Sequence, residues 1–312
     1  MIRFGLALLL VAALAVASLF IGVIDITAQE SNWSLLFQTR IPRTIAVLLT
    51  GMSLAVAGVI MQILARNKFV EPTTTGTVEW ATLGVLLLII FAPQTSVTLK
   101  LIVASLFSVF GSASFLFLLS RIKLRSNVIV PLVGIIYGGI ISSVVMFIAF
   151  QHDLVQAIWT WVQGDFSMIL KGRYELLWIS AGLCLLAYIT ANQFTLVGLG
   201  KSYSQNLGLN YKWYLSWGVL IVSLISGITV VIAGVIPFLG LVIPNLISAI
   251  IGDNLKKSLP WIALLGAGLV LVCDITARLI RFPYEMPVGV IMGVVGSNIF
   301  LTILIKANRK NA

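Results

Sequence analysis

The sequence has few charged side chains: Asp, Glu, Lys and Arg make up 10% of its 312 residues, whereas 60% are hydrophobic. Soluble domains carry about 25% charged residues, so this chain has too few to cover a globular surface in water. It has two cysteines, Cys184 and Cys273, both inside apolar runs, where we expect them to pack as small apolar residues. These scarcities argue against a soluble enzyme, a disordered regulator, a nucleic-acid-binding domain and a disulfide framework.

Motifs for catalysis and metal binding are missing as well. There is no HExxH helix, no G-x-S-x-G elbow and no Cys/His cluster, and the only histidine, His152, is expected in a solvated loop. Gly200-Lys201-Ser202 resembles the end of a phosphate-binding loop, but Thr195 stands where that motif has its first glycine. We therefore expect no enzyme activity, no cofactor and no metal site, and a polytopic membrane enzyme is a poor alternative.

What the sequence has in abundance is uncharged apolar runs, many near the length of about 20 residues that spans a membrane as a helix. Trp213–Gly252 is uncharged for 40 residues and contains Pro237 and Pro244, so it predicts two spans with a tight reversal near Gly234–Pro237. The alternating pattern of a membrane barrel is absent. The other predicted spans are Phe4–Ile24, Thr44–Leu64, Thr77–Ala92, Leu101–Ser120, Val128–Phe150, Leu176–Gly200, Leu259–Arg278 and Met286–Ile305. The sequence thus predicts an all-α polytopic membrane protein with about ten transmembrane helices in a single domain, residues 1–312.

The first apolar run is also compatible with a signal peptide, because Ala15-Val16-Ala17 fits the cleavage pattern. The run continues to Ile24, long enough to span, and many apolar runs follow it. We therefore expect an uncleaved first helix.

Positive charge is unequal between alternate loops, and loops rich in Lys and Arg stay on the cytoplasmic side. One set of loops and termini holds 13 of the 20 basic residues, and the other set holds 7. The larger set is Arg3, Arg66, Lys68, Arg121, Lys123, Arg125, Lys201, Lys212, Lys256, Lys257, Lys306, Arg309 and Lys310. We expect a multi-pass protein of the cytoplasmic membrane with both termini in the cytoplasm, which an even number of spans also requires.

Two loops are longer than a simple connection needs. Asn192–Tyr211, on the cytoplasmic side, is long enough for two short helices outside the membrane. Gln151–Glu175, on the external side, carries Trp159 and Trp161, and tryptophans of this kind are typical of an interfacial belt.

Ionisable residues within spans are costly and often functional. Asp274 lies four residues before Arg278, so the two share a helix face, either as a proton relay or, as we prefer, as a local ion pair. Glu79 begins the third span without an obvious partner in the sequence, so it lines a permeation path or sits in a wet vestibule.

Arginines gather at the external ends of two spans. Arg40 and Arg43 flank Pro42 at the start of the second span, and Arg278 and Arg281 close the ninth. Their planar guanidinium groups suit carboxylates of an external protein, while the alternative is anchoring at lipid headgroups.

Different short motifs follow one another in a characteristic order along almost the whole chain. They are Arg40-Ile41-Pro42-Arg43-Thr44, Gly51-Met52-Ser53-Leu54-Ala55, Gly58-Val59-Ile60-Met61-Gln62, Arg66-Asn67, Glu71-Pro72, Gly76, Gly84, the run from Gly234 to Asn245, Gly252-Asp253, Asp274-Ile275-Thr276-Ala277-Arg278 and Glu285-Met286-Pro287-Val288-Gly289-Val290. With this ordered set the chain resembles the iron–siderophore and cobalamin permease family of ABC importers.

The resemblance implies a type II importer permease of ten helices whose halves form an inverted repeat. Two permease subunits, sister chains or identical copies, would line the path, with two cytoplasmic ABC ATPase subunits and an extracytoplasmic siderophore-binding protein as further partners. Arg40, Arg43 and Arg278 match positions that receive acidic residues of the binding protein. The loop of residues 195–212 matches the ATPase-coupling segment, with contact positions at Leu199, Gly200, Lys201, Ser202, Gly208 and Leu209.

Departures from the usual family motifs narrow the range of expected substrate classes. Asn67-Lys68-Phe69-Val70-Glu71-Pro72 lacks the usual first proline, and Val78-Glu79-Trp80-Ala81 places a carboxylate and an indole near the inner gate. Asn245 and Ser248 replace a usual His and Arg. These features resemble the branch that imports catecholate-type ferric siderophores, so we expect that substrate class. The alternative is a proton-coupled secondary transporter that uses Asp274 and Glu79.

Overall fold

The computed structural model describes residues 2–22, 34, 36–122 and 129–311, and within them the chain is almost entirely helical. Lys123, Arg125 and the expected end of the first span at Ile24 lie outside this part. The α-helices are α1 (Ile2–Phe20), α3 (Ile41–Leu64), α4 (Thr77–Phe91), α5 (Val97–Arg121), α6 (Ile129–Gln151), α7 (Val155–Val162), α8 (Leu177–Ile189), α9 (Ala191–Gly198), α10 (Lys201–Asn206), α11 (Tyr211–Ala233), α12 (Leu239–Ile251), α13 (Leu255–Leu279) and α14 (Val288–Asn311). Short turns of helix are η2 (Leu36–Arg40), η3 (Pro72–Thr74) and η4 (Tyr174–Leu176).

The lengths and apolar composition of these helices confirm a polytopic membrane protein. Seven helices of the described chain are long and apolar enough to span a membrane, and the bent pair α8–α9 makes an eighth candidate. Two shorter apolar helices, α4 and α12, bring the set to the ten that the sequence predicts. The described residues form no strand and only one isolated bridge, between Gln163 and Val235.

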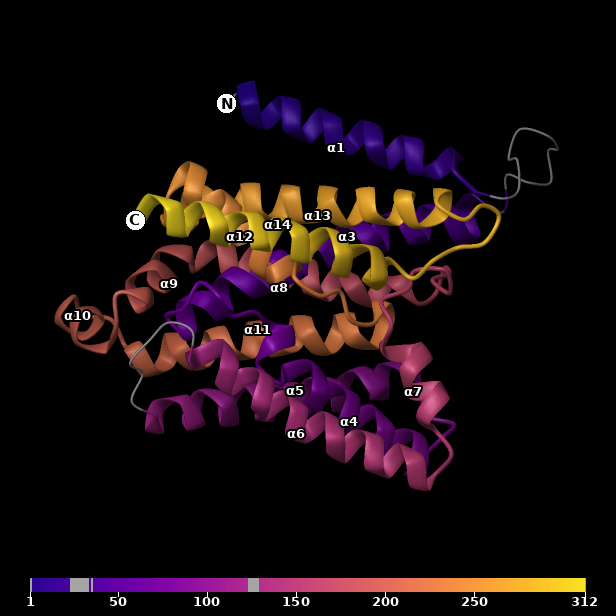
Figure 1. Cartoon of the computed structure of the whole chain (residues 1–312), viewed down its shortest axis with the longest axis horizontal. Coiled ribbons are helices and arrows are strands. Elements are labelled where there is room, and N and C mark those ends of the chain that lie inside the picture. The colour runs from indigo at the N-terminus through magenta and orange to yellow at the C-terminus, as the bar shows by residue number, and fades with distance from the viewer. Residues whose placement is uncertain (1, 23–33, 35, 123–128, 312) are drawn as a thin grey trace.

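The long helices run side by side, so the molecule has two distinct ends (Figure 1). One end carries α9, α10 and both chain termini, and we call it the α10 end. The other carries α7 and the connection from α13 to α14, and we call it the α7 end. An even number of crossings brings the two termini to the same end.

Helix α3 occupies the centre of the bundle, with α11, α12 and α13 packed around it. Glycines allow this close packing, because a Cβ atom at Gly51 would lie 2.6 Å from the carbonyl oxygen of Gly266 in α13. A Cβ at Gly58 would lie 2.2 Å from the Cα of Gly240 in α12. Small residues at such crossings let helix backbones approach closely in a lipid environment, where van der Waals contact drives association.

The predicted span Leu176–Gly200 is not a single straight helix. Helix α8 ends at Ile189, and α9 continues from it at an angle of 66°. At the bend, the Thr190 hydroxyl donates to the carbonyl oxygen of Leu186 at 2.8 Å, and polar residues follow. The two short helices expected within Asn192–Tyr211 are present as α9 and α10, the first beginning one residue earlier.

The reversal predicted after the seventh span, near Gly234–Pro237, is confirmed. Helix α11 ends at Ala233, Gly234 takes a positive φ of 74°, and α12 begins at Leu239. The backbone N–H of Val235 donates to Val162 at the end of α7, which ties the reversal to the segment after α6. That segment is therefore more than an interfacial belt: Trp159 is exposed, but Phe166 and Ile169 are buried in the body.

Candidate functional site

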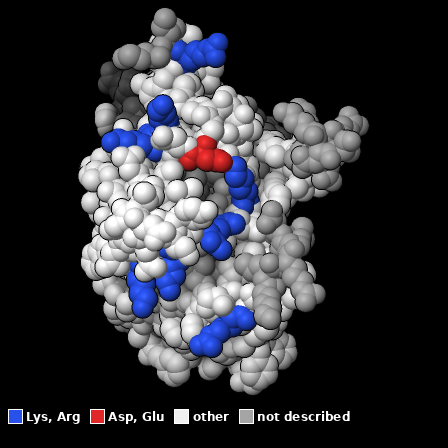
Figure 2. All heavy atoms as spheres, turned by 90° about the vertical axis from the view of Figure 1, so that its left-hand side faces the viewer, with Lys and Arg blue, Asp and Glu red and all other residues white. Residues whose placement is uncertain are grey.

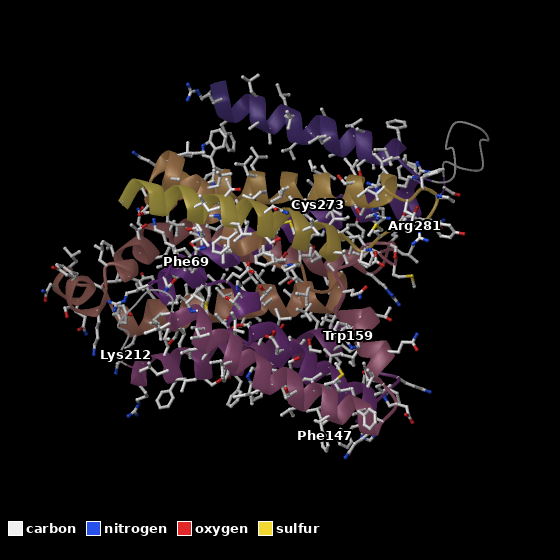
Figure 3. The ribbon with its side chains drawn as sticks, in the orientation of Figure 1. Phe69, Phe147, Trp159, Lys212, Cys273 and Arg281 are labelled. Atoms are coloured by element: carbon white, nitrogen blue, oxygen red, sulfur yellow. The ribbon has the colours of Figure 1, made fainter. Side chains whose placement is uncertain are left out.

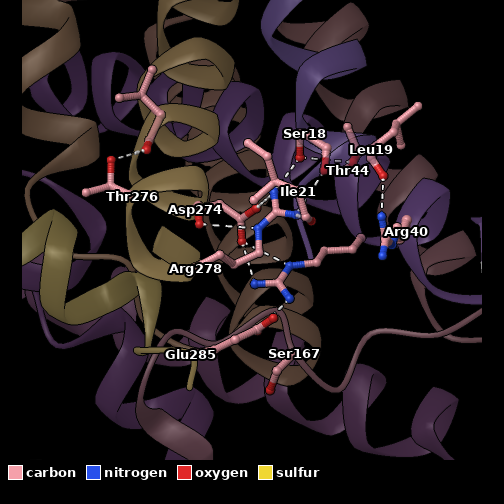
Figure 4. Close-up of polar contacts among 12 residues, drawn as sticks. Ser18, Leu19, Ile21, Arg40, Thr44, Ser167, Asp274, Thr276, Arg278 and Glu285 are labelled. Atoms are coloured by element: carbon pink, nitrogen blue, oxygen red, sulfur yellow. Dashed lines mark hydrogen bonds and ion pairs between the residues drawn. The ribbon is translucent and has the colours of Figure 1, made fainter. Parts of the chain in front are cut away.

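Two arginines and two carboxylates form a connected cluster at the α7 end (Figure 4). Arg43 of α3 donates to Asp274 of α13 at 2.8 Å and to Glu285 at 2.6 Å. Arg278 donates to the second oxygen of Asp274 at 2.6 Å and to the carbonyl oxygen of Ser18 at 3.0 Å. The ion pair predicted between Asp274 and Arg278 is confirmed, and Asp274 bridges two cations.

This cluster changes which arginines are available for an external partner. The side chains of Arg278 and Arg43 are only 5% and 12% exposed, because each is engaged by carboxylates of its own chain. Arg40 donates to the carbonyl oxygen of Leu19 at 2.9 Å. Arg281, which lies at the same end (Figure 3), is exposed. The structure therefore brings Arg43 and Arg278 together as an internal pair and leaves Arg281 on the surface.

Asp274 is not a free carboxylate that could carry protons. Its side chain is fully buried and both oxygens bind guanidinium groups. Protonation would break two ion pairs at once, and removing one partner of a buried pair costs about 3–5 kcal/mol. Of the two acidic residues named for a proton-coupled mechanism, only Glu79 remains unengaged by a cation in the described structure.

Glu79 lines a pocket of about 180 Å³ between α4, α6 and α7. The pocket is mostly apolar, with Val145, Ile158 and Val235 among its walls. The Oε2 atom of Glu79 is buried and has no hydrogen-bond partner among the described residues. A buried carboxylate oxygen without a protein partner, on a residue that lines a cavity, is a candidate contact for water or for a passing ligand.

Trp80, the other residue expected near the gate, does not line this pocket. Its indole N–H donates to the hydroxyl of Tyr137 in α6 at 2.7 Å. Its ring packs on Phe110 of α5 with centroids 4.8 Å apart, and Gly111 leaves room for it. Trp80 thus fixes α4 between α5 and α6, while its neighbour Glu79 faces the pocket.

Sequence reasoning gave no role to Glu71, which links two distant segments. Its side chain is 2% exposed and accepts a hydrogen bond from the backbone N–H of Phe238 at 2.9 Å, where α12 begins. Nearby, the Gln62 amide donates to the carbonyl oxygen of Gly240 at 3.2 Å, and the Asn245 amide donates to that of Lys68 at 2.7 Å. A carboxylate at a helix N-terminus satisfies backbone donors that have no partner within the helix. In the sequence, only its place in the motif Glu71-Pro72 singled it out.

The elbow of α9 and α10 projects from the α10 end (Figure 1). Ser204 is buried and its hydroxyl hydrogen bonds join α10 to the carbonyl oxygens of Leu196 and Gly200, both at 2.7 Å. Large apolar side chains point outward instead, since Leu199, Tyr203 and Leu207 are 56%, 69% and 63% exposed. The other expected coupling residues lie in the same elbow or directly after it. Lys201, Ser202 and Gly208 are exposed and Leu209 is half-buried, but Gly200 is buried and offers no surface for contact. An exposed apolar patch on a braced elbow is typical of a protein-interaction site.

Within the described residues, His, Cys, Asp and Glu nowhere form a group of three that could hold a metal ion. Cys184 and Cys273 are buried and unpaired, as small packing residues.

The comparison with known families decides what this architecture is. The FecCD transport family matches residues 5–306. The chain belongs to this family.

Named proteins are similar to this chain over nearly their whole length. A petrobactin import system permease protein of Bacillus subtilis is 47% identical over 96% of this chain and 96% of the relative. The ferric-anguibactin transport system permease protein of Vibrio anguillarum is 37% identical over 94% of this chain and 95% of the relative. The solved structure of a metal-chelate type ABC transporter in an inward-facing conformation matches with a TM-score of 0.84 at 25% identity, covering 97% of this chain and 99% of that one.

Several motifs that carry the likeness to the FecCD family meet pairwise in the structure although they are far apart in the chain. Arg43 meets Asp274, and Glu71 meets Phe238. The backbones of α3 and α12 cross where Gly58 packs against Gly240. The ordered set of motifs therefore marks helix crossings and the polar contacts that fix them.

Proposed function

We propose that this protein is the permease subunit of an ATP-driven importer that carries a ferric siderophore across the cytoplasmic membrane. Its relatives are permease proteins of petrobactin and ferric-anguibactin import systems. The observation that carries the proposal is a packed helical body with a braced, outward-facing apolar elbow at one end. Such a body positions the substrate and seals the path, and the energy for transport comes from attached subunits. A catecholate-type siderophore is the substrate class that we favour.

The elbow α9–α10 is the proposed seat for a cytoplasmic ABC ATPase, with one ATPase on each of two permease subunits. Leu199, Tyr203 and Leu207 supply apolar contact, and the two hydrogen bonds of Ser204 keep the elbow rigid. A rigid elbow transmits a push from the ATPase into α8 and α11, which flank it in the chain.

The α7 end is the proposed docking face for an extracytoplasmic binding protein. Arg40, Arg43 and Arg278 remain the residues that we connect with this face, but Arg43 and Arg278 act by holding its shape. Arg281 offers the exposed guanidinium group. An arginine fork suits carboxylates of a partner, and exposed charges of this kind contribute mainly to association rate and register.

A second permease subunit, a sister chain or an identical copy, is proposed to complete the path. Helices α6 and α14 leave most of their surface uncovered, each with 22% of its apolar window buried. Glu79 lies in the pocket between α4, α6 and α7, so it is the residue of this chain that we assign to the path.

In the membrane, the α10 end faces the cytoplasm and the α7 end faces outward. Exposed Lys and Arg residues crowd the α10 end in Figure 2, which agrees with the rule that basic residues remain inside. Both termini are then cytoplasmic. Protease or cysteine-labelling access to tags at the two termini, measured from either side of the membrane, tests this orientation.

Uptake of radiolabelled ferric siderophore is the test of function. Deletion of this subunit abolishes uptake, and the intact chain restores it only with an ATPase that hydrolyses ATP. Uptake that survives with an inactive ATPase contradicts the proposal and favours proton coupling. In that case, replacement of Glu79 by Gln removes transport whether or not the ATPase works.

A further inference from the structure

A groove at the α10 end runs between α5 and α11, and apart from Lys201 of the elbow its lining residues have no role in the proposed transport mechanism. It has a volume of about 900 Å³, within the range of pockets that hold small ligands. Its walls are apolar and include Ala113 and Phe117 of α5, and Leu215 and Val219 of α11. Arg66, just beyond α3, and Lys201 of α10 also line it. A long apolar trough with two cations at one end is chemically amphipathic.

The two cations are available to an outside anion. Arg66 and Lys201 are both exposed, and no carboxylate of the described residues forms an ion pair with either. Asp253 is the exposed acidic residue of the described α10 end, and it is paired with Lys68. Figure 2 shows the consequence, a surface on which basic residues dominate.

The dimensions of the groove match one leaflet of a membrane. Along α5 its lining extends from Val109 to Ser120, a rise of about 16 Å at 1.5 Å per residue. The hydrocarbon core of a bilayer is about 30 Å thick, so one leaflet is about 15 Å deep. An acyl chain that lies along α5 and α11 would thus place its headgroup at the level of Arg66 and Lys201.

We propose that this groove binds a phospholipid with an anionic headgroup in the cytoplasmic leaflet. The headgroup phosphate is held by Arg66 and Lys201, and Tyr211 and Ser216 line the same groove. The acyl chain covers the apolar walls. A basic pocket between membrane helices at the cytoplasmic side is a suitable site for an anionic headgroup.

The position of this lipid links it to the elbow. Lys201 is the first residue of α10, and Arg66 lies against Gly200, where a Cβ atom would be 2.6 Å from an Arg66 guanidinium nitrogen. The lipid headgroup therefore contacts both the end of α3 and the elbow that we assign to the ATPase. This part of the inference rests on the proposed function, whereas lipid binding itself does not.

Lipid retention by the purified importer complex tests the site. The complex in neutral detergent is incubated with phosphatidylglycerol or phosphatidylcholine of identical acyl chains, and bound lipid is counted by native mass spectrometry. We expect preferential retention of phosphatidylglycerol. The double variant R66Q/K201Q, which removes both cations, is expected to lose that preference by tenfold or more. Ala113→Phe, which fills the groove, is expected to lower retention of both lipids, and Ser216→Phe serves the same purpose if that variant fails to fold.

The matched control is K256Q/K257Q, which removes two exposed charges from the same end but outside the groove. It should keep the preference for phosphatidylglycerol. Equal retention of the two lipids by the unaltered complex overturns the proposal. A loss of preference for phosphatidylglycerol in the control that is as large as the loss in R66Q/K201Q overturns it as well. Displacement of the lipid by inorganic phosphate alone also overturns it, because the apolar walls would then contribute nothing. Loss of the ATPase from R66Q/K201Q with lipid preference intact assigns these cations to the ATPase instead. Ala113→Phe and Ser216→Phe lie in α5 and α11, outside the elbow, so lipid loss in them is separable from a failure of transport.

Discussion

Asp274 divides its carboxylate between two arginines, with Oδ1 bound to Arg43 and Oδ2 bound to Arg278. Arg43 is 231 positions away in the chain, and Arg278 is one helical turn away. Glu285 binds the other side of Arg43, so two positive and two negative groups balance within the cluster. Because Arg278 also binds carbonyl oxygens at the end of α1, the cluster joins α1, α3, α13 and the segment before α14.

Asp274→Asn should be strongly destabilising. The change leaves two guanidinium groups with one carboxylate, and breaking a buried pair costs about 3–5 kcal/mol. We expect a clear fall in the thermal unfolding midpoint of the detergent-solubilised protein. Asp253→Asn is the control, because the pair of Asp253 with Lys68 is 71% and 55% exposed and exposed pairs contribute about 0.2–1 kcal/mol. Similar midpoints for the two variants would show that the cluster does not hold the helices together.

Arg281→Glu should weaken association of the binding protein without loss of stability. Arg281 is exposed and has no ion pair in the described structure, and its guanidinium group lies over the exposed ring of Tyr284, 5.9 Å from the centroid. Reversing its charge therefore removes one surface contact and leaves the buried packing unchanged. Titration calorimetry at several salt concentrations is the measurement, since exposed charges are screened over about 10 Å at 0.1 M salt. We expect the difference from the unaltered protein to shrink as salt rises. Arg278→Gln, by contrast, should lower thermal stability. If Arg281→Glu leaves the association with the binding protein unchanged, then Arg281 anchors the protein at lipid headgroups instead.

Much of the fold could be predicted from local features of the sequence. Uncharged runs mark membrane spans because a charge in the hydrocarbon core is costly, and α5 and α6 match their predicted bounds within four residues or fewer. The reversal at Gly234 was visible because glycine and proline interrupt a run that is too long for one span. In each case the residues that determine the structure are neighbours in the chain.

Polar contacts between distant segments could not be predicted in the same way. The spacing of four residues predicts the pair of Asp274 with Arg278. It does not reveal that Asp274 also binds Arg43, 231 positions away, or that Arg278 binds Ser18, 260 positions away. Glu71 reaches Phe238, 167 positions away, and nothing near Glu71 in the chain indicates that contact. The bend after α8 was missed because Leu176–Gly200 is uncharged throughout, so hydropathy alone does not show where the helix axis changes.

Gly58→Ala should be among the most damaging single-methyl changes in the chain. The added Cβ would lie 2.2 Å from backbone atoms of Gly240, so α3 and α12 would have to move apart. Overpacking of this kind costs about 1–3 kcal/mol, and more where backbone must shift. Gly182→Ala in α8 is the control, because a Cβ there meets nothing within 4 Å and alanine favours helix by about 1 kcal/mol. Folded yield and unfolding midpoint are measured for both variants. Equal values in Gly58→Ala and Gly182→Ala would contradict the tight crossing of α3 and α12.

The pair of Lys68 with Asp253 should contribute a small stability that does not change between pH 8 and about pH 5. Partial burial alone raises the pKa of Asp253, but hydrogen bonds from Ser248 and Lys68 and the charge of Lys68 outweigh it, so the pKa lies below the ordinary value. A carboxyl group whose pKa is lowered on folding stabilises the folded state at pH values above its unfolded pKa, about 3.9. That contribution disappears as the pH falls through the folded pKa. A double-mutant cycle of Lys68→Ala and Asp253→Ala at both pH values should give the same coupling, about 0.2–1 kcal/mol. A coupling that is lost by pH 5 would contradict the lowered pKa.

Glu79→Gln should alter uptake while the protein remains folded. The buried Oε2 atom has no hydrogen-bond partner in the described structure, so a neutral amide of the same shape removes a charge from the pocket without breaking a protein contact. If the carboxylate contacts the passing substrate or its water, we expect uptake of ferric siderophore to change by severalfold at an unchanged unfolding midpoint. Thr82→Val is the matched control, because Thr82 lines the same pocket but donates its hydroxyl to the carbonyl oxygen of Val78. Normal uptake in Glu79→Gln would remove this residue from the path and leave the pocket as a packing defect between α4, α6 and α7.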